Sequence, residues 1–146
     1  IALPSFLNQA NKAKQSEAKQ YLASINKGQQ AYYAEKSAFI EDVTNIAKLG
    51  LGIKTATSNY TYDLGESDVG TKDGVHAWTK SSGNGLKPYA GLVYLVEADG
   101  ALTSETALCE AEDAAADPTN IAAPGTPGTA ADARNCSAVT GYTIPL

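Results

Sequence analysis

The apolar positions in the first quarter of the chain follow the period of an α-helix. From residue 18 onward they recur mainly in steps of three and four, the spacing of one helix face. They are Ala18, Leu22, Ile25, Tyr32 and Phe39, with Tyr21 and Tyr33 widening the stripe and Gln29 and Lys36 interrupting it. Residues 8–33 contain no proline and a single glycine, and most of them favour helix. The pattern predicts one continuous helix within residues 1–35, with a core face formed by Ala18, Tyr21, Leu22, Ile25 and Tyr32.

The length of this helix predicts that one of its ends projects from the protein. At about 1.5 Å per residue it is about 50 Å long, whereas a compact domain of this chain length is about 30 Å across. The wide apolar stripe starts only at Ala18, and residues 8–20 are mostly small or polar. We therefore expect the N-terminal end to project. Residues 1–7 are apolar again, which predicts that they contact another protein copy or a lipid bilayer.

The pattern changes after residue 36. Residues 36–58 are expected to connect the helix to a sheet and to include a second short helix over residues 40–48, which ends at glycines. Residues 59–110 hold apolar stretches rich in Tyr, Val, Thr and Trp, separated by Gly, Asp and Asn. They are NYTYDLG, GVHAWTKSS, YAGLVYLVEA and TALCE. This pattern predicts an antiparallel meander of about four strands, and hence an α+β fold.

The last part of the chain loses any usable period. Residues 111–134 are dominated by Ala, Asp, Pro, Gly and Thr, which predicts a loop. Cys109 and Cys136 flank this loop. They are either two reduced, buried thiols or a disulfide, and a bridge closing such a loop contributes about 3.5 kcal/mol in the chain-entropy model. We favour the disulfide over residues 109–136, which implies an oxidising compartment.

Composition narrows the class of protein. With 146 residues, 43% of them hydrophobic, the chain has the size of a single domain over residues 1–146. The net charge is −5 and the basic residues form no dense cluster, so direct binding of nucleic acid is not expected. No stretch reaches the roughly 18 apolar residues of a membrane span. The chain lacks methionine, and we interpret its first residue as the product of a cut.

The candidate chemistry of the chain is sparse. His76 could act as a general base, but no serine or cysteine stands in a recognisable nucleophile context, and a histidine packed beside Trp78 on a strand is the simpler interpretation. The C-terminal loop carries acidic residues that could hold calcium, but they lack EF-hand spacing. They are Glu112, Asp113, Asp117 and Asp132. We therefore expect no enzyme activity, no cofactor and no metal.

Three stretches of the sequence resemble type IV pilins of the cyanobacterial group. They are IALPSFLNQANKAKQSEAKQYLASINKGQQAYYAEKSAF at the start, LGLGI near residue 50 and YTYDL in the first predicted strand. The resemblance implies the pilin fold, in which a long N-terminal helix packs on an antiparallel sheet followed by a disulfide-bounded C-terminal loop. It also implies that the chain is truncated, having lost an upstream apolar helix of about 20 residues, the length that crosses a membrane.

The resemblance implies a role as the structural subunit of a pilus filament on the cell surface. Such subunits are held in the inner membrane, extracted by an assembly machinery, and polymerised for adhesion, twitching motility or DNA uptake. The residues expected at the filament interface are Ile1, Leu3, Pro4, Phe6, Leu7 and Ala10. The partners are then other pilin subunits, the assembly machinery and the inner membrane. The alternatives are a minor pilin, an adhesin-type binding module and a secretion-system pseudopilin.

Overall fold

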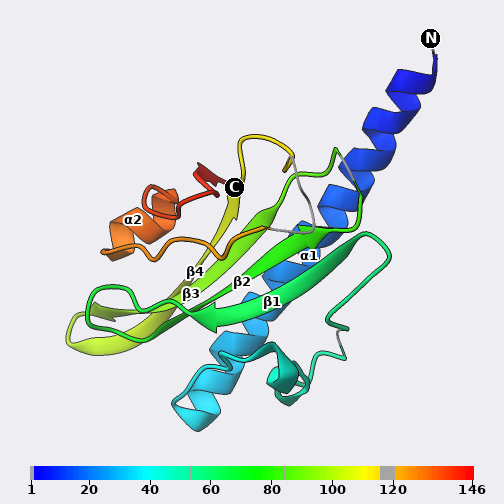
Figure 1. Cartoon of the computed structure of the whole chain (residues 1–146). Coiled ribbons are helices and arrows are strands. Elements are labelled where there is room, and N and C mark those ends of the chain that lie inside the picture. The colour runs from blue at the N-terminus through cyan, green and yellow to red at the C-terminus, as the bar shows by residue number, and fades with distance from the viewer. Residues whose placement is uncertain (1, 53, 84, 116–120) are drawn as a thin grey trace.

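A computed structural model describes residues 2–52, 54–83, 85–115 and 121–146, with side chains from residue 6 onward. A long helix, α1 (Ala2–Lys36), is followed by a short 3-10 helix, η1 (Val43–Leu49). Four strands come next: β1 (Tyr60–Glu66), β2 (Gly74–Ser81), β3 (Tyr89–Ala98) and β4 (Ala101–Glu110). The chain ends with α2 (Ala130–Asn135) and β5 (Ile144–Pro145). In Figure 1, α1 runs along the sheet, and its N-terminal end extends past it.

The sheet is antiparallel throughout, with the strands in the order of the chain from β1 to β5. The Asp99–Gly100 turn joins β3 to β4, and both of its residues have positive φ, 52° and 78°. Asp and Gly are the residues that such tight hairpin turns favour. The predicted long helix and antiparallel meander are thus confirmed, and the sheet gains one more strand than expected.

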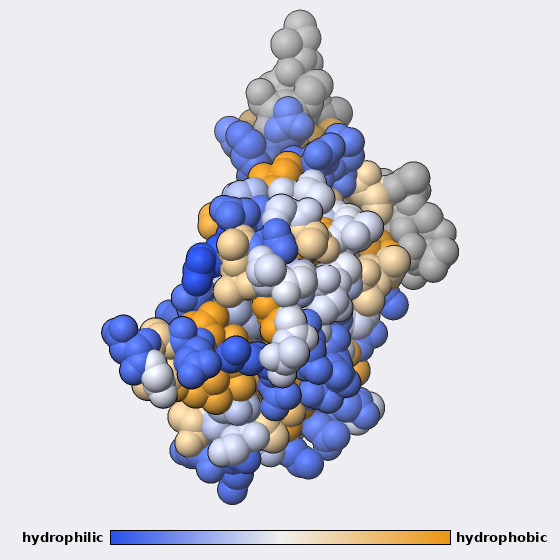
Figure 2. All heavy atoms as spheres, turned by 90° about the vertical axis from the view of Figure 1, so that its left-hand side faces the viewer, coloured by the Kyte–Doolittle hydropathy of each residue, from blue (hydrophilic) through white to orange (hydrophobic). Residues whose placement is uncertain are grey.

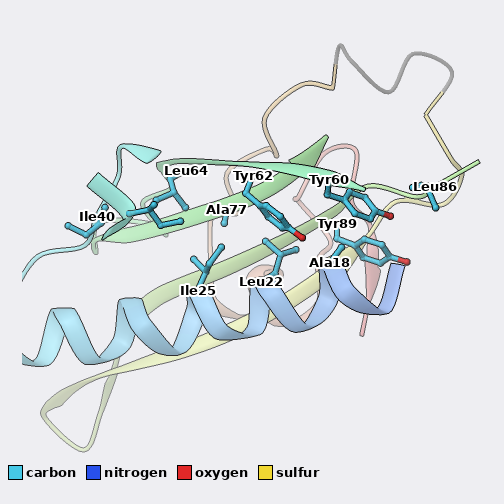
Figure 3. Packing of buried hydrophobic residues seen from close by; sticks show 11 residues of the cluster. Ala18, Leu22, Ile25, Ile40, Tyr60, Tyr62, Leu64, Ala77, Leu86 and Tyr89 are labelled. Atoms are coloured by element: carbon cyan, nitrogen blue, oxygen red, sulfur yellow. The ribbon is translucent and has the colours of Figure 1, made fainter. Parts of the chain in front are cut away.

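The face of the sheet that α1 covers holds a core built from the predicted helical stripe. Ala18, Leu22 and Ile25 are 0–1% exposed. Figure 3 shows Leu22 and Ile25 pointing from α1 toward the ring of Tyr62. Tyr21 stacks on that ring with centroids 5.0 Å apart, and the half-buried Tyr32 packs at the edge of the same cluster.

Gln29, which interrupts the apolar stripe, is itself buried. Its amide nitrogen donates to the carbonyl oxygen of Ile40 at 2.7 Å, and its amide oxygen accepts from the Ile40 N–H at 2.9 Å. Both polar ends of the side chain are therefore satisfied, which removes the cost of burying them. Gln29 joins α1 to the connection that follows it.

The connection from the helix to the sheet differs from the prediction in two ways. Phe39 does not continue the helical stripe, because α1 ends at Lys36 and Ser37 turns the chain with φ 55°. The Phe39 ring instead packs against Tyr33, with centroids 4.6 Å apart. The short helix begins at Val43, three residues later than expected, because the preceding Asp42 accepts from the Thr44 N–H and caps it.

The opposite face of the sheet is covered by the C-terminal part of the chain. His76, Trp78 and Leu92 lie on this face by strand alternation, and Trp78 and Leu92 share a cluster with Val139 and Tyr142. The prediction of a loop over residues 111–134 is wrong at its end, where α2 forms. The sequence signal for α2 is the Thr129–Asp132 pair, in which Thr129 caps the helix by accepting from the Asp132 N–H.

Candidate interaction surface

The start of α1 is exposed where the rest of the protein does not reach it. Phe6 and Leu7 are 64% and 58% exposed, and Asn8, Gln9 and Ala10 are also exposed. Figure 2 shows hydrophilic residues around the helix where it leaves the body of the protein. Of the other residues expected at this surface, Leu3 and Pro4 lie in the first turns of α1 with side chains outside the described residues, and Ile1 lies outside them altogether.

The body of the protein begins to hold α1 at about Gln15. Its side-chain oxygen accepts from the Lys87 N–H at 3.1 Å. Two residues further, Glu17 accepts from the amide of Asn59 at 2.8 Å. Ala18 is then fully buried. We call residues 6–14 the free segment of α1, since the polar contacts to the body start immediately after it and only Asn11 within it is partly buried, beside Gly85.

The free segment is basic. Lys12 and Lys14 are its only ionisable residues, and both side chains are exposed. The free segment therefore combines two exposed apolar side chains with positive charge, which suits a partner that offers an apolar hollow beside negative charge.

The far end of the molecule carries a second exposed apolar feature, which the sequence did not reveal. A hollow of about 320 Å³ lies between the last turns of α1 and the β3–β4 hairpin. Tyr33, Ala34, Leu95 and Leu102 contribute its apolar lining. Leu102 is 55% exposed. It lies in β4 next to the β3–β4 turn, where three successive residues are exposed, and the sequence pattern did not single it out.

The C-terminal segment is held by a disulfide. Cys109 and Cys136 are bonded, fully buried and 5.9 Å apart between Cα atoms, which confirms the predicted bridge. Arg134 adds a two-pronged contact to Glu105, with nitrogen–oxygen distances of 2.7 and 3.1 Å. The guanidinium lowers the pKa of the Glu105 carboxyl. Burial, and then the charge of Glu105, raise the pKa of Tyr94 to about 12.

His76 is buried in the face of the sheet opposite α1. Its ring meets the Trp78 ring edge-on at 5.1 Å, and only 5% of the residue is exposed. Burial lowers the pKa of His76 to about 4. The imidazole is therefore neutral at physiological pH and enclosed by side chains. Both cysteines are in the disulfide, so neither supplies a thiol nucleophile.

The acidic residues of the C-terminal part do not converge. Asp132 bonds to the hydroxyl groups of Thr129 and Ser137. Glu112 accepts from Thr143 at 3.4 Å, and Asp117 lies outside the described residues. Within the described ranges, no three His, Cys, Asp or Glu side chains are grouped so that they could hold a metal ion. In that same part of the chain, no helix is both long and apolar enough to cross a membrane.

The long projecting helix, the antiparallel sheet and the disulfide-bounded C-terminal segment together define the architecture of a type IV pilin. The model of one protein family, described as Type IV pilin-like G and H, matches residues 15–137. The chain belongs to this family. A search of curated proteins and a search of solved structures return no match.

Proposed function

We propose that the chain is a structural subunit of a type IV pilus filament and polymerises through the start of α1. The observation that supports this most directly is the free segment, where Phe6 and Leu7 remain exposed on a helix that extends past its own sheet. Exposed apolar groups that the fold does not need mark a surface for another protein or a membrane. Membership of a pilin-like family favours other pilin subunits as the partner.

The energetics favour assembly that involves more than this segment alone. Burying Phe6 and Leu7 contributes about 3–6 kcal/mol in total. Bringing two proteins together costs about 4–15 kcal/mol in lost freedom, which is as much or more. The chain described here is therefore expected to be monomeric or weakly associated in dilute solution. Further apolar surface, from an upstream helix of the kind pilins carry, is expected to complete the contact.

In this role the subunit is held in the inner membrane through an upstream apolar helix, and an assembly machinery stacks it into a filament on the cell surface. The filament then serves adhesion, twitching motility or DNA uptake. The chain is a building block and performs no catalysis. The amount of this chain in sheared, purified filaments separates a major subunit from a minor pilin, an adhesin or a pseudopilin, because only the major subunit forms most of the filament mass.

The test is to introduce Phe6→Glu together with Leu7→Glu into the gene in its own host. We expect surface filaments, counted by electron microscopy, to be lost, because two buried carboxylates would stand in the subunit contact. The melting temperature of the purified double variant should stay close to that of the unchanged chain. The matched control is Leu146→Glu, at a leucine that is 56% exposed at the other end of the chain. Normal filaments in the double variant would contradict the proposed role.

A further inference from the structure

Two exposed apolar features lie near opposite ends of α1; elsewhere in the described part of the chain, Leu51 and Leu146 are also exposed. Phe6 and Leu7 lie near the start of α1, and the hollow lined by Ala34 and Leu102 lies near its end. From Leu7 to Ala34 the helix rises about 40 Å. Figure 1 shows the start of α1 and the β3–β4 hairpin at opposite extremes of the protein. A chain cannot bring its own two features together, but two copies can.

The hollow is a formed surface with fixed walls. Gln30 of α1 donates to the carbonyl and hydroxyl oxygens of Ser104 in β4, at 3.3 and 3.0 Å, and so ties the helix to the hairpin at its rim. Leu95 forms a buried part of its lining and Leu102 an exposed part. Ser37, whose N–H donates to the Tyr33 carbonyl at 2.8 Å, ends the helix at the hollow. An apolar side chain from outside would thus meet both aliphatic and aromatic surface.

The charges of the two ends are complementary. The free segment carries Lys12 and Lys14. The far end of the molecule carries four carboxylates, which we call the acidic end: Glu41, Glu66, Asp68 and Asp73. Two lysines belong to the same region, Lys36 in the last turn of α1 and Lys72 beside Asp73 in the sequence. Burial, and then the repulsion of the other three carboxylates, raise the pKa of Glu41. The helix C-terminus adds partial negative charge on the same side.

We propose that the free segment of one copy docks on the far end of a second copy, with Phe6 and Leu7 in the hollow and Lys12 and Lys14 beside the acidic end. This inference rests on the proposed function, since it names the surface that receives the polymerising segment. With the two helices parallel, Leu7 of the first copy lies level with Ala34 of the second.

The occupant is a second copy because the same chain carries both surfaces. The free segment matches the far end in apolar character and in charge. The contact is also heterologous, since two different surfaces meet. A contact of this kind leaves one free surface at each end of a pair, so it continues into an open row unless the geometry closes a ring. Each copy is shifted by about 40 Å along the helix axis relative to the one it binds. A filament needs a contact with this property.

The first test places one cysteine on each surface, Leu7→Cys and Leu102→Cys in the same chain, in the gene of the host that assembles the filaments. Mild oxidation of filaments should give a ladder of covalently linked subunits on a non-reducing gel. Each single variant should give dimers at most. The matched control pair is Leu7→Cys with Leu146→Cys, which should give no ladder. A ladder from the control pair and none from the Leu102 pair would overturn the inference while filaments, and hence the proposed function, remain.

The second test reverses the charges and does not need cysteines. Lys12→Glu with Lys14→Glu should lower the number of filaments at least about tenfold, and Glu66→Lys with Asp73→Lys should do the same, because each places like charges together. The four changes in one chain should restore most filaments. If the fourfold variant forms no more filaments than the two double variants, the inference is overturned.

The third measurement uses the purified chain and decides the case if the altered genes make no filaments. Protein without nitrogen-15 carries a nitroxide on the cysteine of Leu7→Cys. It is mixed at millimolar concentration with nitrogen-15-labelled chain, whose amide signals are observed by NMR. Broadening should be strongest at the amides of Ala34, Leu102 and Thr103, and absent at Ile144. Broadening centred elsewhere, or none at all, would overturn the inference.

Discussion

The two halves of α1 are continuous in the backbone and opposite in what they do. From Ala18 to Tyr33 the helix packs on the sheet, and Leu22 at its centre is fully buried. In the free segment the side chains from Phe6 to Ala10 are all exposed. An isolated helix is marginal in water, and packing supplies most of its stability in a protein. The free segment is therefore kept helical by continuation from the packed half, and its side chains are left for a partner.

The packed half of α1 thus serves stability, and the free segment serves assembly. Changes in the packed half should unfold the protein, and changes in the free segment should alter only what binds to it. Four measurements test this division of α1.

Leu22→Ala should have the largest effect on folding. The leucine is fully buried in the helix–sheet core, and its truncation leaves a cavity that the surrounding side chains fill only in part. We expect a loss of about 2–5 kcal/mol in the free energy of unfolding. Urea denaturation of the purified chain measures it. A loss below about 1 kcal/mol would mean that the packed half contributes no more than a surface helix.

Acidification should weaken the body of the protein through His76. Burial holds the pKa of His76 at about 4 in the folded protein, against about 6.5 in the unfolded chain. The unfolded state therefore binds the proton first, so this stability is fully present above pH 6.5 and is lost as the pH falls toward 4. The loss is about 3 kcal/mol. Urea denaturation at several pH values should show a shallower acid decline in His76→Gln, and equal slopes would contradict the assignment to His76.

Gln29→Ala should have an intermediate effect. The change removes both hydrogen bonds to Ile40 and leaves a buried N–H and a buried carbonyl without that partner. The expected cost is about 1–3 kcal/mol, measured by urea denaturation. Gln9→Ala makes the same chemical change at an exposed position of the free segment and should cost almost nothing, because the two residues differ little in helix propensity. Similar losses at both positions would remove the distinction between the two halves.

Leu7→Ala should have the smallest effect on folding and is the matched partner of Leu22→Ala. The residue type, the helix and the truncation are the same, but Leu7 is 58% exposed. We expect the free energy of unfolding to stay within about 0.5 kcal/mol of the unchanged chain. A loss of about 2 kcal/mol or more would show that the free segment belongs to the folding core.

Some of what tertiary structure added could have been found by a closer look at local signals, and some could not. The Thr129–Asp132 pair is a local sign of α2 that composition obscured, because the surrounding Ala, Pro and Gly suggest a loop. The strand β5 has only two residues, so it has no period to detect, and it forms because Pro145 and Ile144 lie opposite Cys109 and Glu110 of β4. Gln29 interrupts the apolar period, and only the position of Ile40 explains its burial.

The features of this protein that repeat over many residues could be predicted from the sequence. The helical period from Ala18 to Tyr32, the strands over residues 59–110 and the two flanking cysteines each carry local information, which is why α1, the meander and the disulfide could be predicted. Contacts between distant segments set the point where α1 leaves the body, the hollow beside Leu102 and the approach of Glu66, Asp68 and Asp73 to Glu41. These features depend on which distant segments meet, and the distance between segments in space is not encoded in the period of either one.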